Sequence, residues 1–274
     1  MPFSRWGPPI DVLALLAKEE QALIDLLGGL DADQWAAPTA CAGWSVHDVA
    51  AHILGDKLGR LSRDRDDYRV GGPRPGEAFG VFIDRINAEW VLALRRLSPE
   101  VLFGLLVDST AQITDLWSRL DLDELGEPVS WAGPEPAPVW LDAAREYTEY
   151  WVHQQQIREA VGARPLDQRE FRDPVIDTFM RALPFTLRDC EARVGKQVTY
   201  TVGGQVWTAR REAEGWLLDR CSPGKATVSS VSTDADTFWR LCTRTVRPAD
   251  VEDRVTAKGE LAETMLGMVS IILS

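Results

Sequence analysis

Two residues in one expected helix have the types and spacing of metal ligands. Glu149 and His153 lie four positions apart in the segment REYTEYWVHQQQIREA, so their side chains would lie about 40° apart on one helix face. A carboxylate and an imidazole placed in this way can both bind one metal ion. The alternative is a solvated Glu–His pair, because this face is otherwise polar. It also contains Asp142, Arg145, Glu146 and Gln156.

The chain has three histidines, and the other two lie close together in SVHDVAAHILGDKLGRL. His52 falls between Asp48 and Asp56 on a helical wheel, away from the apolar arc, so periodicity alone favours a surface histidine over a buried one. His47 lies in the first turn of this helix, where a positive charge gains nothing from the helix dipole. We therefore interpret His47 as a structural or exposed residue.

Cysteine provides one further candidate for chemistry. Cys41 precedes the same helix in the segment TACAGW, and a thiol near a helix N-terminus can have a lowered pKa and act as a nucleophile. A small packing residue is the alternative. The other cysteines, Cys190, Cys221 and Cys242, are scattered without a CxxC pair, which favours neither a disulfide framework nor a zinc knuckle. The G-x-S-x-G, Walker A and G-x-G-x-x-G motifs are absent from the sequence.

Composition limits the partners and the compartment. The 274 residues carry a net charge of −12, with 45% hydrophobic and 26% charged residues. A globular protein is expected, and the negative charge argues against binding to nucleic acid or to an anionic membrane. The first residues, MPFSRWGPPIDVL, do not resemble a signal peptide, and no apolar run reaches the ~18–20 residues of a membrane helix. We expect a cytoplasmic protein.

The first two-thirds of the chain must position these candidates, and this part is predicted to be helical. Ser45 and Asp48 have the spacing of a capping box, and Ser98 followed by Pro99 is a typical helix start. The expected helices cover residues 10–29, 45–65, 77–97, 99–122 and 138–161. A Pro- and Gly-containing segment, GARPLDQREFRDP, follows as the best candidate for a linker.

The last third changes its pattern after one more helix at 174–193. Gly203 and Gly204 separate two β-rich runs in QVTYTVGGQVWTARR, which predicts a hairpin. GWLLDRC and ATVSSVST are two further expected strands, Asp234 begins a short helix, and ELAETMLGMVSIIL is an amphipathic helix. We predict two domains, a helical domain at 1–165 and an α+β domain at 166–274, with helix 174–193 able to pack on either.

Two motifs together resemble a known family. The segment LDADQWAAPTACAGWSVHDVAAHILGD is similar to the N-terminal signature of the mycothiol-dependent maleylpyruvate isomerase family, part of the DinB-like metal-binding superfamily. YTEYWVHQQQIREAVG is similar to a later helix of that family. The matching residues of the first motif are Leu30, Trp35, Cys41, Gly43, Trp44, Ser45, Val46, Asp48, Val49, His52 and Ile53. Those of the second are Glu149, His153, Ile157, Ala160 and Gly162.

The resemblance implies a fold and a metal site. The fold would be a DinB-like four-helix bundle of up-down-down-up type, followed by a small α+β domain similar to sterol carrier proteins. The metal ligands of the family fall on His52, Glu149 and His153, which would place His52 in a cleft between helices. The metal would be divalent, with zinc first and nickel or another ion as alternatives, and mycothiol would be the thiol cofactor. Mycothiol also implies an actinobacterial source.

A third segment bears on substrate binding. The family commonly has Trp-x-Leu-x-x-Gly-Arg in the C-terminal domain, and this chain has Trp239, Leu241 and Arg244, with Thr243 taken as the position of the glycine. In the isomerase interpretation Arg244 is the candidate that would hold a substrate carboxylate. Three other arginines compete with it: Arg240, Arg247 and Arg254.

The resemblance implies an enzyme acting on a small electrophilic or unsaturated acid, as a monomer or a homodimer. In an isomerase, the thiolate would add to a conjugated cis double bond, and rotation and elimination would follow. In a thiol S-transferase, the thiolate would stay attached to the electrophile. Two alternatives remain open, a metal-dependent hydrolase that uses no thiol and a non-enzymatic protein that binds a lipid or another small molecule.

Overall fold

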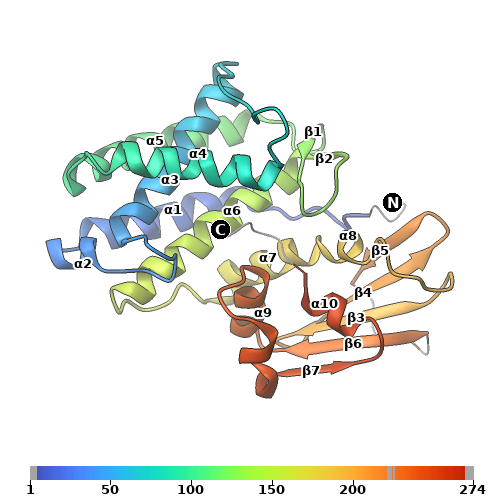
Figure 1. Cartoon of the computed structure of the whole chain (residues 1–274). Helices are drawn as coiled ribbons and strands as arrows, with labels where there is room; N and C mark the ends of the chain where they lie inside the picture. The colour runs from blue at the N-terminus through green and yellow to red at the C-terminus, as the bar shows by residue number, and fades with distance from the viewer. Residues whose placement is uncertain (1–4, 221–223, 225, 269–274) are drawn as a thin grey trace. The chain divides into compact units, whose positions relative to one another are not determined.

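The computed structural model describes residues 5–220, 224 and 226–268. The chain is a mixed helical and sheet protein (Figure 1), and it divides into two compact units. The helical unit comprises Val12–Asp121 and Glu146–Phe171. The sheet unit comprises residues 5–11, Leu122–Arg145 and the described residues from 172 to 268. The two domains expected from the sequence, residues 1–165 and 166–274, stay a prediction.

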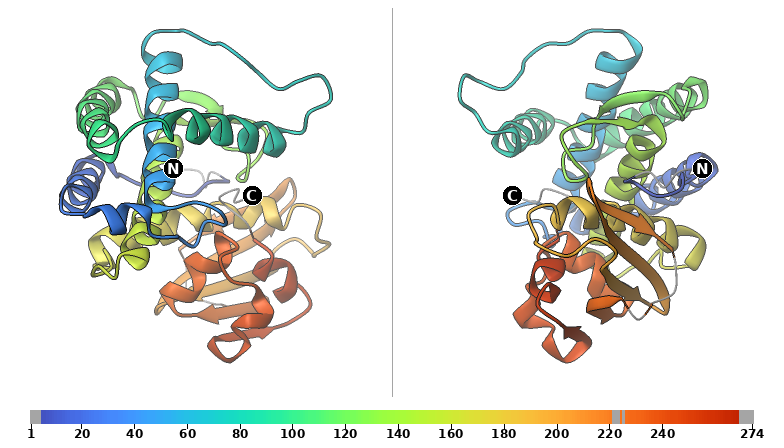
Figure 2. Two further views of the ribbon diagram at one scale, coloured as in Figure 1. Left: turned by 60° about the vertical axis from the view of Figure 1, so that its left-hand side comes forward. Right: turned by 90° about the vertical axis from the view of Figure 1, so that its right-hand side faces the viewer.

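The helical unit agrees closely with the helices expected from the sequence. Its helices are α1 (Leu13–Gly28), α2 (Ala32–Ala36), α3 (Val46–Arg60), α4 (Phe79–Leu94), α5 (Pro99–Arg119) and the second part of α6 (Val139–Ala160). A short π-helix, Leu61–Arg65, continues α3. A long loop then leads to α4, as both views in Figure 2 show. The short helix α2 has no counterpart in the sequence prediction.

Local capping chemistry determines where α3 begins. The Ser45 hydroxyl accepts a hydrogen bond from the Asp48 amide at 3.3 Å, and Asp48 Oδ2 accepts one from the Ser45 amide at 3.1 Å. The Arg95 guanidinium donates to both Asp48 oxygens, at 2.8 and 3.0 Å. These bonds outweigh burial and lower the pKa of Asp48. The predicted capping box is therefore confirmed, and it anchors the helix that carries His52.

The core of the helical unit lies where α1 and α3 pack against α5. Apolar side chains at helical spacing supply it, as expected for amphipathic helices that bury one face. Its buried members include Leu16, Leu23, Leu27, Val49, Ile53, Leu102, Leu106 and Ile113. Among the residues that the structure describes, no helix combines the length and the apolar character needed to cross a bilayer.

The sheet unit contains a five-stranded sheet. Its strands are β3 (Gln197–Val202), β4 (Gln205–Glu212), β5 (Gly215–Asp219), β6 (Thr227–Thr233) and β7 (Val255–Lys258), in the order β5-β4-β3-β6-β7. Strands β3 and β6 are parallel, and the other neighbours are antiparallel. Gly203 and Gly204 have φ values of 55° and 86°, which a two-residue hairpin turn with positive φ at both positions requires. The predicted hairpin is confirmed.

Helices and a small hairpin complete this part of the chain. They are β1 (Leu125–Pro128), β2 (Pro136–Pro138), α7 (Arg169–Met180), α8 (Leu183–Thr186), α9 (Ala235–Cys242) and α10 (Ala262–Leu266). Ring contacts of Phe238 with Phe179 and Tyr200 pack α7 and α9 on the sheet. The expected helix 174–193 is wrong in extent, because Pro174 lies inside α7 and the helix ends at Met180. The predicted C-terminal helix, ELAETMLGMVSIIL, is found only as the short α10, which ends at a C-cap at Gly267. The last residues of that prediction, 269–274, lie outside the described residues.

Candidate metal centre

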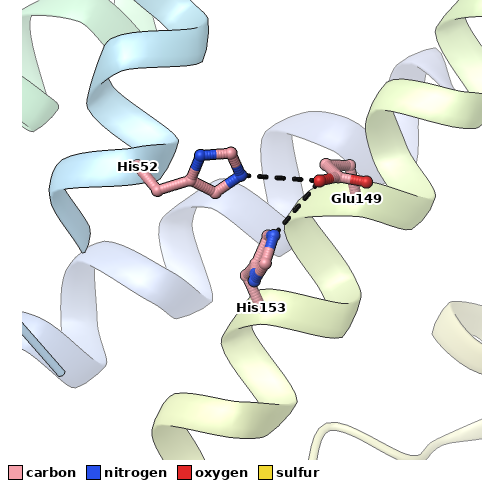
Figure 3. A group of neighbouring side chains, drawn as sticks. All are labelled: His52, Glu149 and His153. Atoms are coloured by element: carbon pink, nitrogen blue, oxygen red, sulfur yellow. Dashed lines mark hydrogen bonds and ion pairs between the residues drawn. The ribbon is translucent and has the colours of Figure 1, made fainter. Parts of the chain in front are cut away.

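Three donor atoms meet within the helical unit. His52 projects from α3, whereas Glu149 and His153 project from one face of α6 (Figure 3). Glu149 Oε1 lies 3.5 Å from His52 Nε2 and 3.1 Å from His153 Nε2. One donor atom from each residue lies within 4.8 Å of the other two. Ligands around a tetrahedral zinc ion lie roughly 3–3.5 Å apart, so small adjustments would bring the three donors around one ion.

The three side chains are enclosed. His52 is 6% exposed and His153 is 2% exposed, and the side chain of Glu149 is 18% exposed. Periodicity alone favours a surface His52, and that interpretation is wrong. The solvated alternative for the face of α6 is wrong for Glu146 and Gln156, which are 0% and 1% exposed. Helical periodicity assigns polar residues to solvent, but here polar side chains of different helices face one another.

The pKa values of the two histidines are shifted in opposite directions. Burial lowers the pKa of His52, although the hydrogen bond to Glu149 opposes this. Burial also acts to lower the pKa of His153, but hydrogen bonds with Cys41 and Glu149 outweigh it and raise that pKa to about 10. Burial would raise the pKa of Glu149, but its bonds to both imidazoles hold it well below the usual range. A carboxylate thus lies between two imidazoles, and its negative charge favours a cation there.

Buried ion pairs connect the helices that carry the site. The Arg60 guanidinium, on α3, donates two hydrogen bonds to the Glu146 carboxylate on α6, at 2.8 and 2.9 Å. The Tyr150 hydroxyl donates to Glu146 Oε1 at 2.7 Å and also contacts Asp56 Oδ2 at 3.1 Å. Charge-assisted bidentate bonds have defined geometry, so they fix α3 relative to α6 one turn away from Glu149.

A second buried polar cluster links α1 to the same helices. Lys57 Nζ lies 2.5 Å from Glu20 Oε1, and both side chains are almost fully buried. Gln154, next to His153, donates to Glu19 Oε1 at 2.5 Å. Burial, together with the charge of Glu20, raises the pKa of Glu19 to about 8. Glu19 therefore carries its proton at neutral pH.

The remaining histidine and the nearby cysteine have different environments. His47 Nε2 lies 3.1 Å from the Leu97 carbonyl oxygen, and its ring packs edge-on against Trp35, which confirms the structural interpretation. Cys41 is partly buried, and its Sγ lies 3.1 Å from Gln156 Oε1. Sequence reasoning missed Gln156 as a partner of the site. Its position three residues after His153, on the same helix face, was the available signal.

Arg244 lies in the sheet unit, exposed, just after α9. Its backbone has a φ of 54°, a left-handed conformation that glycine adopts readily. Counted from Trp239, the glycine of Trp-x-Leu-x-x-Gly-Arg corresponds to position 244 itself, not to Thr243. Two competing arginines, Arg240 and Arg247, form ion pairs with Asp236 and Asp250. The carboxylate-binding role of Arg244 stays a prediction.

Comparison with known proteins identifies the helical part of the chain. The profile of the family described as the mycothiol maleylpyruvate isomerase N-terminal domain matches residues 16–158, a span that contains all three donor residues. The chain belongs to this family. It is 28% identical over 164 residues to the uncharacterized protein Rv0036c of Mycobacterium tuberculosis, with 59% of this chain and 61% of that protein covered. The chain thus spans about three-fifths of this relative.

A second relative and two solved structures extend the comparison. The uncharacterized protein Rv0738 of Mycobacterium tuberculosis is 26% identical over 149 residues, which cover 46% of this chain and 82% of that protein. Crystal structures of the mycothiol-dependent maleylpyruvate isomerase and of a mutant of it match with TM-scores of 0.54 and 0.55. Each match covers 90% of this chain and 92% of the other at 14% identity. The chain therefore shares the mixed helical and sheet fold of that isomerase.

The donor set of this family member fits a divalent metal. Two imidazole nitrogens and one carboxylate oxygen are ligands that zinc and other divalent first-row metals accept. Three protein ligands leave positions free for a further ligand, as in catalytic rather than structural zinc sites. The burial of His52 and His153 and the charge of Glu149 between two imidazoles agree with this donor set.

Proposed function

We propose that the chain is a metal- and thiol-dependent enzyme, which acts as a cis–trans isomerase or a thiol S-transferase on a small unsaturated or electrophilic acid. One observation carries the proposal. His52, Glu149 and His153 bring three donor atoms within 4.8 Å of one another, inside the segment that matches the family profile. The thiol would be mycothiol, and zinc is the first choice of metal, ahead of nickel or another divalent ion.

The residues of the chain would hold the metal and keep its surroundings dry. His52 and His153 would present Nε2, and Glu149 would present Oε1, the atoms that face one another now. A bound divalent metal would lower the pKa of a thiol or water ligand. The Trp44 ring packs 5.3 Å from the His52 ring, centre to centre, and shields that imidazole from water. The Arg60–Glu146 bonds would preserve the spacing of α3 and α6.

Finer features of the chain belong to the same proposal. We assign the helical part to a DinB-like four-helix bundle, and the C-terminal part to a domain similar to sterol carrier proteins. We further propose Arg244 as the group that binds the substrate carboxylate, in a cytoplasmic enzyme that is a monomer or a homodimer. The five-stranded sheet with one parallel pair supports an α+β assignment for the C-terminal part.

Metal analysis and a thiol comparison test this function. The purified protein should contain one divalent metal per chain, and His52→Ala should lose it. The matched control is His47→Ala, which alters a histidine of the same helix that contacts the Leu97 carbonyl instead. Turnover of cis-enoic acids and electrophiles should then require mycothiol. Wild-type protein without metal would refute the proposal, and equal turnover without any thiol would indicate a hydrolase.

A further inference from the structure

Gln156 is a buried amide that contacts one of the three donor residues. It lies on α6, three residues after His153, and is 1% exposed. Its Oε1 lies 2.7 Å from His153 Nδ1, on the side of the imidazole away from Glu149. The same oxygen lies 3.1 Å from Cys41 Sγ, in the segment before α3. One amide oxygen therefore links the donor cluster to the start of another helix.

The chemistry of this contact fixes the proton positions. An amide oxygen can only accept hydrogen bonds, so the proton lies on His153 Nδ1, and the Cys41 thiol donates to the same oxygen. In the metal-free protein Nε2 also carries a proton, which it donates to Glu149 at 3.1 Å. A metal would replace that proton and bind the Nε2 lone pair, while Nδ1 keeps its proton on the Gln156 oxygen. A metal-binding histidine is commonly oriented through its other nitrogen in this way.

The two histidines of the site differ in this respect. Among the residues that the structure describes, none is within hydrogen-bond distance of His52 Nδ1, and the His52 ring packs instead against Trp44 and His153. His153 is thus the one imidazole of the pair whose outer nitrogen is held by a directional bond within the described part of the chain. Of the two histidines, a change at Gln156 should therefore act directly on His153 and not on His52.

We infer that Gln156 is a positioning residue for the metal site: its amide oxygen selects the His153 tautomer that directs Nε2 towards the metal, and Cys41 holds that amide in place. The inference rests on the proposed metal-dependent function. It adds that full metal affinity requires a hydrogen-bond acceptor at position 156 as well as the three ligands.

Substitutions that separate shape from hydrogen bonding test the inference. Gln156→Leu removes the acceptor at similar volume, and Gln156→Glu keeps an acceptor that cannot donate when ionised. Gln155→Leu is the matched control, because Gln155 is buried on the same helix but bonds to the Leu166 backbone. Zinc affinity, measured by competition with a chelator, should fall about 10–100-fold in Gln156→Leu. It should stay within a few-fold of wild type in Gln156→Glu and Gln155→Leu.

A spectroscopic readout separates this inference from the proposed function. In metal-free protein, imidazole ¹⁵N NMR should show His153 with a proton on Nδ1 in wild type and in Gln156→Glu. In Gln156→Leu, the Nδ1 proton should lose its protection from solvent exchange. An unchanged His153 signal in Gln156→Leu would overturn the inference, as would unchanged zinc affinity. Wild-type protein that binds no metal but shows the predicted NMR change would refute the proposed function and confirm the hydrogen bond.

Discussion

His52 Nε2 lies 3.5 Å from Glu149 Oε1, although the two residues belong to different helices, α3 and α6. Their proximity depends on everything that fixes one helix against the other, including the Arg60–Glu146 pair. The properties of the site and the stability of the helical unit are therefore coupled, and variants can separate the two.

Glu149, the proposed carboxylate ligand, should contribute more to zinc affinity than a residue that only contacts a ligand, such as Gln156. Glu149→Gln keeps the shape but removes the negative charge between the two imidazoles, so zinc affinity should fall by at least about 100-fold, beyond the range typical of outer partners. Isothermal titration of zinc into metal-free protein measures this. His47→Ala should bind zinc like wild type. Equal affinities of Glu149→Gln and wild type would exclude Glu149 as a ligand.

The cap of α3 should influence the metal as well as stability. Ser45→Ala removes the side-chain acceptor at the N-terminus of the helix that carries His52, and it should cost about 1 kcal/mol of unfolding free energy. Ser98→Ala removes an equivalent cap on α5 and should cost a similar amount in urea unfolding. We expect only Ser45→Ala to weaken zinc binding. A weaker affinity in both variants would show a general effect of stability.

Removing one partner of the buried Lys57–Glu20 pair should strongly lower the unfolding free energy. Lys57→Met leaves the Glu20 carboxylate in a buried position without its partner, which should lower the unfolding free energy by about 3–5 kcal/mol. The double variant Lys57→Met with Glu20→Leu should recover most of that loss, since it leaves no unpaired charge. Chemical denaturation of both variants and wild type gives the comparison. A double variant less stable than Lys57→Met would contradict this account.

Glu19 should make stability depend on pH in an unusual direction. Its pKa is about 8 in the folded chain and 4.5 as the ordinary value, so between these pH values the folded state holds a proton that the unfolded state has released. Wild-type stability should therefore decrease as pH rises from 4.5 to 8. Glu19→Gln lacks this contribution. Its unfolding free energy relative to wild type should therefore increase as pH rises, by no more than about 5 kcal/mol.

Denaturation of wild type and Glu19→Gln at several pH values checks the Glu19 prediction. The control is Glu170→Gln, which alters a glutamate whose side chain is 55% exposed in an ion pair with Lys18. The stability of Glu170→Gln relative to wild type should vary little between pH 5 and 8.5. If the difference in unfolding free energy between Glu19→Gln and wild type does not change with pH, Glu19 is ionised in the folded protein.

A glycine substitution at Arg244 separates the backbone conformation of this residue from its proposed role in substrate binding. Arg244→Gly relieves a left-handed backbone conformation, and this gain should offset the entropy that glycine adds to the unfolded chain, so stability should change by less than about 0.5 kcal/mol. Arg247→Gly, at a φ of −93°, should destabilise. If Arg244 binds the substrate carboxylate, KM for an acid should rise in Arg244→Gly. An unchanged KM would exclude that role.

Local signals explain what could be predicted from the sequence. The cap at Ser45 and the turn at Gly203 and Gly204 each depend on a few adjacent residues, and all are found where expected. Pro174 misled the prediction of α7, because the helix begins at Arg169 and accommodates a proline in its interior. The short strands β1, β2 and β7 have no periodic pattern long enough to detect.

The site required information that periodicity does not contain. The i, i+4 spacing of Glu149 and His153 left a solvated pair as an alternative, and the wheel position of His52 favoured solvent. The resemblance brought the three together, and the structure agrees with that grouping. The partner role of Gln156 depends on tertiary contacts with Cys41. Helical spacing alone does not distinguish a polar face in water from a polar face against another helix.

The buried polar face of α6 also has a consequence for the evolution of the sequence. Glu146, Glu149, His153 and Gln156 occupy enclosed positions that leucine or alanine would fill without any need for charged partners on neighbouring helices. Stability alone gives little reason to retain them. Relatives without the proposed metal chemistry should therefore have replaced these positions together with His52. The polarity of this one helix would then distinguish relatives that bind the metal from those that do not.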